Sequence, residues 1–161
     1  MNSIRALVVL VALGRVARAQ DEFEIQVYDA DTAKAGEAGL EVHANYHLIH
    51  AAPDQAHLTL EPHYGVTEWF EAGLYLPLYS IDKNLGAVIN GFKLRTLFAV
   101  PHADDRRFFY GANFEFSVNA KHWDPKTFSS EVRPIIGWHL HPVDIIINPI
   151  LDTEYDGFKN L

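Results

Sequence analysis

The sequence predicts an all-β protein, an antiparallel up-and-down transmembrane β-barrel with about seven or eight strands. Apolar and polar residues alternate along most of the chain, which is the period of a strand with one apolar and one polar face. The alternating segments run about 9 to 11 residues, the length that crosses a bilayer at a tilt. The polar face also carries acidic residues that a dry core could not accept without partners, namely Glu41, Glu61, Glu71, Glu115 and Glu131.

Composition narrows the class of protein. A length of 161 residues suits a single domain. With 13 Lys and Arg against 21 Asp and Glu, the formal charge is −8, so the chain lacks the basic excess that nucleic-acid binding needs. The absence of cysteine excludes disulfides, cysteine zinc sites and thiol catalysis, and 48% apolar residues exclude a disordered chain.

The first 19 residues predict a secretory signal peptide. Arg5 precedes an apolar run over residues 6–14, and the sequence Ala-Arg-Ala at 17–19 is a cleavage signature. The alternative is a short buried N-terminal helix. Cleavage would leave a formal charge of −11. We therefore divide the chain into a signal peptide (1–19), a periplasmic N-terminal segment (20–39) and a β-barrel domain (40–161).

Six segments after the N-terminal segment carry the alternation. Even positions are apolar in the first three, and the later three continue the pattern from Val88 to Leu140. A seventh segment, 144–151, is apolar on both faces apart from Asn148, and residues 24–28 are a candidate for a short extra strand. The six alternating segments are 40–48, 57–64, 69–78, 88–98, 108–119 and 131–140.

The predicted connections alternate in length, as in outer-membrane barrels with short periplasmic turns. Short turns are expected at 65–68, 101–105 and 141–144. Longer polar loops are expected at 79–87 and 120–130, and 51–56 is intermediate. Aromatic residues near strand ends, where interfacial girdles belong, are Trp69, Phe70, Phe98 and Trp138. The soluble alternative is a lipocalin-like periplasmic binding barrel, which would reverse the faces and bury the even positions.

Several stretches resemble a family of exported Gram-negative proteins that are described as outer-membrane β-barrel, porin-like or transporter proteins. The resemblance covers nearly the whole mature chain and implies an outer-membrane location and a barrel fold. It brings no catalytic residue and no substrate. The stretches that carry it are 24–29, 39–43, 64–77, 133–138, 148–151 and 155–157.

The expected strand count leaves the barrel incomplete. Bacterial single-chain barrels have an even number of strands, at least eight, and family members look longer than a chain that stops at Leu161. We therefore expect a C-terminally truncated chain. The alternatives are that residues 24–28 supply an eighth strand, or that the protein is oligomeric.

The polar face supplies the candidate site residues, which would line the lumen of the barrel. If the first hairpin centres near Pro53, His43 falls opposite His63 and Asn45 opposite Glu61, close enough to share a zinc, copper or nickel ion. A hydrated lumen wall explains these residues better, so no metal and no cofactor is predicted. The lumen-lining candidates are Glu41, His43, Asn45, His47, His57, Glu61, His63, Glu71, Lys93, Arg95, Glu115 and Arg133.

The charged candidates have two interpretations. They could line a pore and set its ion preference, or they could pair and fill the interior of a small barrel that conducts nothing. Eight strands favour the filled interior, and more strands favour the pore. No enzyme motif is present, and the only enzymatic alternative is a lipid-modifying hydrolase at the rim, with candidates Ser80, Ser129, Ser130, His50 and His122.

The sequence therefore predicts a non-enzymatic outer-membrane barrel, either a porin-like channel or transporter for small solutes or a structural envelope protein. Its expected partners are outer-membrane lipid and, for a channel, small solutes, and no nucleic acid. Neither the substrate nor the oligomeric state follows from the sequence.

Overall fold

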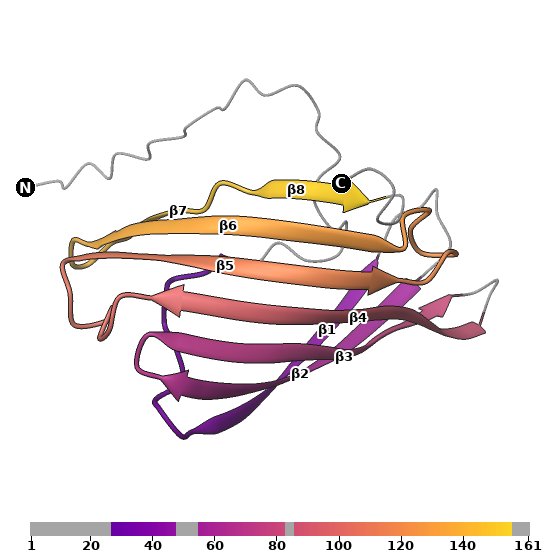
Figure 1. Cartoon of the computed structure of the whole chain (residues 1–161), viewed down its shortest axis with the longest axis horizontal. Coiled ribbons are helices and arrows are strands. Elements are labelled where there is room, and N and C mark those ends of the chain that lie inside the picture. Colours follow the sequence, from indigo (N-terminus) through magenta and orange to yellow (C-terminus); the bar gives the residue numbers. More distant parts are fainter. Residues whose placement is uncertain (1–26, 48–54, 83–85, 156–161) are drawn as a thin grey trace, which may run out of the picture.

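The computed structural model describes residues 27–47, 55–82 and 86–155. These residues form eight β-strands and no helix (Figure 1). No helix in this part of the chain is long and apolar enough to span a membrane. The strands are β1 (Ala38–His47), β2 (Gln55–Thr67), β3 (Phe70–Asp82), β4 (Gly86–Ala99), β5 (Phe108–Asn119), β6 (Phe128–His139), β7 (Asp144–Ile147) and β8 (Leu151–Tyr155).

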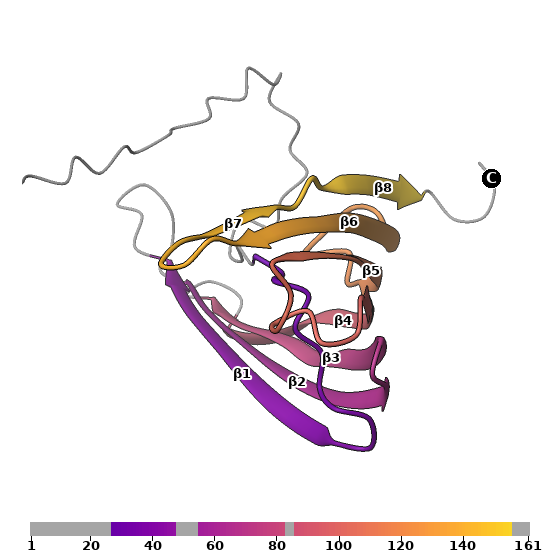
Figure 2. The same ribbon diagram turned by 90° about the vertical axis from the view of Figure 1, so that its left-hand side faces the viewer.

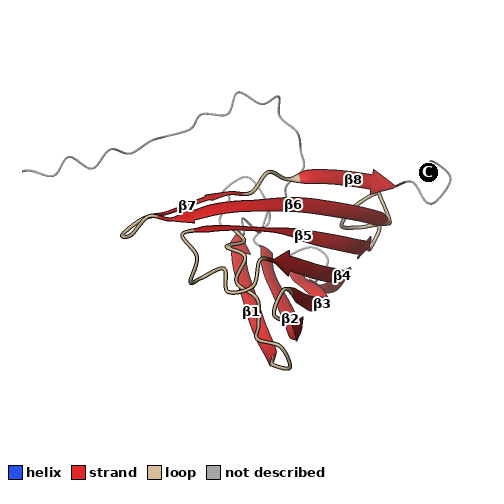
Figure 3. Cartoon of the chain, turned by 60° about the vertical axis from the view of Figure 1, so that its left-hand side comes forward, coloured by secondary structure: helices blue, strands red, loops and turns tan. Residues whose placement is uncertain are grey.

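All eight strands belong to one antiparallel sheet in which each strand pairs with the next along the chain, from β1 to β7. β8 also pairs with β6, so β7 and β8 follow one another along the same edge of that strand. The sheet curls strongly into a barrel-like trough (Figures 2 and 3). Within the described residues no ladder joins β1 to β7 or β8. The all-β, antiparallel prediction is confirmed.

The predicted seventh strand is in fact two short strands, because residues 148–150 interrupt it. The Asn148 side chain accepts a hydrogen bond from the Tyr28 backbone N–H at 2.9 Å and donates one to the Tyr28 carbonyl at 3.1 Å. Pro149 has no N–H to donate to a ladder. The expected strand at 24–28 is not seen at Tyr28, which lies outside regular structure, and residues 24–26 fall outside the described part.

Bulges in β3 and β4 interrupt the alternation that the sequence suggested. The β3–β4 register shifts on both sides of the Leu78–Gly91 pair. Gly91 has a φ of 148°, and an added Cβ would lie 2.1 Å from the Val118 carbonyl oxygen. Beyond the bulge Val88 pairs with the buried Ser80, so it faces the concave side. Its predicted place on the apolar face is wrong.

The predicted alternation of short and long connections is also wrong. The turn expected at 65–68 is two residues long and lies at 68–69, and Gly65 belongs to β2. The long loop expected at 79–87 shrinks to 83–85, because β3 and β4 extend farther than predicted. On the other side, the connection expected at 101–105 spans 100–107. β3 and β4 stay paired past the clear hydrophobic pattern, which is why the pattern alone misplaced the ends of the connection expected at 79–87.

Residues 27–37, which belong to the predicted periplasmic N-terminal segment (20–39), cross the concave side of the sheet (Figure 2). This inner segment is tied to the sheet at both ends. At one end, the Tyr28 backbone binds the Asn148 side chain. At the other end, the Gly36 N–H donates to the Gly65 carbonyl at 2.7 Å, and the Gly65 N–H donates to the Glu37 carbonyl at 2.9 Å. Between them the Ala33 N–H donates to Glu71 Oε2 at 2.6 Å.

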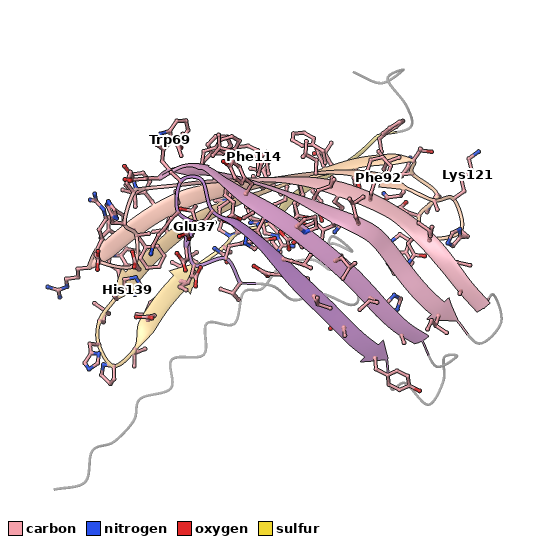
Figure 4. All side chains as sticks on the ribbon, turned by 90° about the horizontal axis from the view of Figure 1, so that it is seen from below. Glu37, Trp69, Phe92, Phe114, Lys121 and His139 are labelled. Atoms are coloured by element: carbon pink, nitrogen blue, oxygen red, sulfur yellow. The ribbon has the colours of Figure 1, made fainter. Side chains whose placement is uncertain are left out.

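The sheet has polar residues inside and apolar residues outside. Figure 4 shows Trp69, Phe92 and Phe114 along the outer side of the curved strands. The concave side instead buries polar and charged side chains. Large apolar side chains on the convex side include Leu40, Val42, Leu58, Leu60, Leu76, Phe92, Leu94, Tyr110, Phe116 and Ile136, all more than one-third exposed.

A small apolar core occupies one end of the concave side. Tyr28 and Ala30 of the inner segment pack there with residues from β4, the 100–107 loop, β5 and β6. This core fills the concave side at the end nearest the 100–107 loop. Its other members are Leu97, Ala99, Ala103, Phe109 and Ile135.

Gly65 permits the close approach of the inner segment, so Gly65→Ala should destabilise the fold. The added Cβ would lie 2.3 Å and 2.4 Å from the backbone oxygens of Lys34 and Ala33. We expect the free energy of unfolding to fall by about 1–3 kcal/mol, the usual cost of overpacking, measured by urea titration. In a chain whose residues 27–37 are replaced by a Gly/Ser linker, the same substitution should be nearly neutral. An equal loss in both backgrounds would contradict the contact.

Candidate functional site

The concave side of the sheet gathers most of the residues predicted to line a lumen. Asn45 and Glu41 are exposed near the β1 edge, and the side chain of His47 lies outside the described part. His43, His63 and Lys93 are half-buried. The remaining six candidates are buried, namely His57, Glu61, Glu71, Arg95, Glu115 and Arg133.

Arg95 is the centre of the largest charge cluster. Its guanidinium, on β4, forms ion pairs with Glu61 of β2 and with Glu71 of β3, the latter at 2.5 Å. All three side chains are at most 6% exposed. Burying charges costs several kcal/mol per ion unless they are paired, so the arrangement is stable only because each carboxylate finds the guanidinium. Three strands and, through Glu71, the inner segment thus converge on one cation.

Glu115 of β5 is the centre of a second cluster. Its carboxylate accepts hydrogen bonds from the Tyr28 hydroxyl at 2.8 Å and from the Asn113 amide at 3.0 Å, and Lys93 lies 3.6 Å away. The Tyr28 hydroxyl also lies 3.1 Å from that of Tyr75. Burial, and next the charge of Glu115, raise the pKa of Tyr28 far above its usual value. Tyr28 therefore stays protonated and acts as a hydrogen-bond donor.

Tyr28 also lies beside two buried guanidinium groups. The guanidinium carbons of Arg95 and Arg133 are 5.9 and 5.4 Å from the centre of its ring, within cation–π range. Arg133 forms an ion pair with Glu131 on the same strand. One side chain of the inner segment therefore contacts residues of β3, β4, β5 and β6, and it fills space that an open lumen would leave to water.

The predicted register of the first hairpin is wrong by four residues. The structure pairs Glu41 with Glu61, and His43 with Thr59, instead of His43 with His63. The loop is centred nearer to residue 51 than to Pro53. Because a shift by an even number keeps the faces, the same residues still point to the concave side. His43 Nε2 reaches Glu61 Oε2 diagonally, at 3.2 Å.

Some of the proposed rim residues form a polar network at the other end of the sheet. Ser80 Oγ lies 2.7 Å from His57 Nδ1, Asn90 donates to Ser80, and His122 Nε2 lies 3.1 Å from Asn90 Oδ1. A serine bonded to an imidazole is the pair that a nucleophile needs. Ser80 is only 2% exposed, however, which leaves its hydroxyl no access to a bulky lipid.

Of the other rim candidates, Ser129 makes a separate contact on β6. Ser129 Oγ accepts a hydrogen bond from Asn119 at 3.1 Å. Ser130 lies beside it on β6, and His50 falls outside the described residues. The arrangement therefore gives no support to a hydrolase.

Sequence reasoning missed four residues that fill the interior. Leu97, Phe109 and Ile135 occupy inward positions of strands whose other inward residues are mostly polar, and Tyr28 was assigned to a strand. The available signal was that these apolar residues break the alternation at equivalent ends of β4, β5 and β6. Because adjacent hairpins bring these ends together, three such breaks indicate an apolar layer inside.

Comparison of the chain with family models, with curated proteins and with solved structures finds no match. The resemblance to exported outer-membrane proteins therefore stays a prediction. Any functional conclusion must depend on the physical properties of the two faces of the sheet.

Removal of the Arg95 charge should destabilise the fold strongly. In Arg95→Met, Glu61 and Glu71 would remain buried without their cation, and we expect a loss of about 3–5 kcal/mol in the free energy of unfolding. Combining Arg95→Met with Glu61→Gln and Glu71→Gln should recover part of that loss. The exposed Arg107 is the matched control, and Arg107→Met should change the value by less than about 0.5 kcal/mol. Equal effects of the two Arg substitutions would contradict the role of Arg95.

Proposed function

We propose that this protein is an outer-membrane β-barrel protein of the structural type, which places its convex face in lipid and closes its interior to solutes. The observation that carries the proposal is the inversion of the two faces, with ion pairs buried inside and large apolar side chains exposed outside. In water such a continuous apolar surface would be a strong site of association. In a bilayer it is the surface that a spanning barrel requires.

Strand length and aromatic placement support the same proposal. β1 to β6 have 10 to 14 residues, enough to cross the hydrocarbon layer at a tilt. Aromatic rings gather at one end of the sheet. The Phe70 and Phe98 rings are stacked with their centroids 4.7 Å apart, and the Phe108 and Trp138 ring centroids are 5.4 Å apart. Trp69, also near Phe98, joins them. Such a cluster suits the membrane–water interface.

The soluble alternative requires the opposite arrangement. A periplasmic binding barrel of the lipocalin type takes an apolar ligand into an apolar interior. Here the central part of the concave side is occupied by Arg95, Glu115 and their partners. An apolar ligand there would exclude water from those charges, and the free-energy cost of that desolvation exceeds the gain from the apolar contacts.

The filled interior favours a structural protein over a pore. The charges of Arg95, Lys93 and Arg133 are each paired with a carboxylate, either on a neighbouring strand or on the same strand. The inner segment crosses the concave side, and the apolar core fills one end of it. Small barrels whose interiors are filled in this way do not conduct.

Membrane insertion also requires that the two edges of the sheet be paired. Unpaired backbone groups cost several kcal/mol each in hydrocarbon. The proposal therefore includes pairing of the β1 edge with the β7 and β8 edge, or of both with a second copy. The signal peptide expected at 1–19 would supply the export that this location needs.

A charged substitution on the convex face tests the lipid contact. Leu94, 45% exposed, lies in β4 between Leu74 and Phe116. If it faces lipid, Leu94→Arg should make folding into vesicles less favourable by about 2–4 kcal/mol. The folded fraction is read from the shift of the band between unboiled and boiled samples on a denaturing gel. Val143→Arg, in the exposed 140–143 turn, is the control and should be neutral.

Two outcomes would contradict the membrane proposal. One is a neutral Leu94→Arg together with a chain that stays soluble without detergent, since an exposed leucine in water tolerates arginine. The other is an absence of any band shift in the unsubstituted chain, since a closed membrane barrel resists unfolding by detergent.

Conductance tests whether the interior is closed. The unsubstituted chain in a planar bilayer should give no steady current, because the charges are paired and the inner segment crosses the concave side. A variant with residues 27–37 replaced by a Gly/Ser linker should show ion conductance under the same voltage. A steady current from the unsubstituted chain would instead identify an open, porin-like channel.

A further inference from the structure

The first hairpin places four metal-ligating side chains together at the accessible edge of the concave side. Glu41 and His43 come from β1, and Glu61 and His63 come from β2. Ligand atoms of Glu41, His43 and Glu61 all lie within 4.8 Å of one another. His63 Nδ1 lies 3.9 Å from Glu41 Oε1. The group thus contains two imidazoles and two carboxylates, the ligands that zinc accepts.

The distances between ligand atoms suit one small divalent ion. His43 Nε2 is 3.2 Å from Glu61 Oε2 and 3.5 Å from Glu41 Oε2. Zinc bonds of about 2.0–2.2 Å in a tetrahedron separate neighbouring ligand atoms by roughly 3.3–3.6 Å. Both separations around His43 are close to that range, so little movement of these side chains is needed to bind an ion between them.

The charges of this hairpin also call for a cation. Glu41 and Glu61 are direct cross-strand partners, and like charges in that position repel. Arg95 compensates Glu61 and Glu71 together, so the three carboxylates Glu41, Glu61 and Glu71 exceed it by two negative charges. A divalent ion would balance that excess.

Two further observations point to a ligand position. Arg95 contacts Glu61 through Oε1, which leaves Oε2 directed at His43, as outer contacts orient metal ligands in known sites. The Nδ1 atom of His63 is buried and makes no hydrogen bond among the described residues, although Glu41 is the nearest carboxylate. A metal ion held by Glu41, His43 and Glu61 would use that nitrogen once the His63 ring moves toward it. Glu41 itself is half-exposed, so an ion could enter from solvent.

We propose that Glu41, His43, Glu61 and His63 form a binding site for a divalent transition-metal ion of the zinc type. The site does not depend on the convex face meeting lipid, because all four ligands belong to one hairpin and point to the concave side. It differs from the pairing expected from the sequence, in which Asn45 rather than Glu41 faced Glu61. Binding would join β1 to β2 near the edge of the sheet.

The test uses the folded full chain without a polyhistidine tag, titrated with Zn²⁺ in a calorimeter and with Co²⁺ in an absorption cell. We expect one ion per chain and the intense visible bands of tetrahedral Co²⁺. His43→Ala should weaken Zn²⁺ binding at least 100-fold, and Glu41→Gln at least 10-fold. The matched control is His102→Ala, which removes an exposed histidine paired with Glu68 at 3.4 Å, and it should leave the affinity unchanged.

Each outcome decides the proposal. Absence of a 1:1 binding isotherm in the unsubstituted chain overturns it, since the imidazoles would then hold only protons. Equal loss in His102→Ala and His43→Ala also overturns it, because that pattern indicates scattered surface binding. If His43→Ala fails to fold, Glu41→Gln decides the question alone, because Glu41 is half-exposed and its substitution conserves shape. Unchanged Co²⁺ bands in that variant would count against the site.

Discussion

The burial of charge on the concave side is the constraint on which the rest of this structure depends. Arg95 can lie there only if Glu61 and Glu71 reach it, and that requirement holds β2, β3 and β4 in one register. Glu71 then uses its second oxygen to bind the Ala33 backbone N–H. An uncompensated charge at this depth would cost several kcal/mol, far more than one hydrogen bond contributes.

The inner segment depends on this network and in turn completes it. Tyr28 donates to Glu115, lies beside two guanidinium groups and fixes Asn148 through its backbone. These contacts join residues up to 120 positions apart. A segment that carries little regular structure therefore connects the two halves of the sheet. The inner segment is the reason that we propose a closed interior. Its contact with Asn148 also explains why β7 ends at Ile147.

The two faces of the sheet separate the two proposals made for this protein. The convex face, apolar from β1 to β7, supports a location in lipid and would be a liability in water. The concave face is divided into an apolar layer, a set of paired charges and the His/Glu group of the first hairpin. Among the described residues, the His/Glu group brings together two imidazoles, excess negative charge and access to solvent, which is why a bound ion is proposed there.

The sequence alone determined that the chain forms antiparallel strands with one polar and one apolar face, because a period of two survives any even shift in register. For that reason Glu61, Arg95 and Glu115, expected on one face, lie together on the concave side although the first hairpin was misaligned. The tertiary structure decided the rest. The pairing of Glu41 with Glu61, the bulge at Gly91 and the break at Asn148 depend on contacts between distant segments. A local pattern carries no information about such contacts, since their energy arises only when the partners meet.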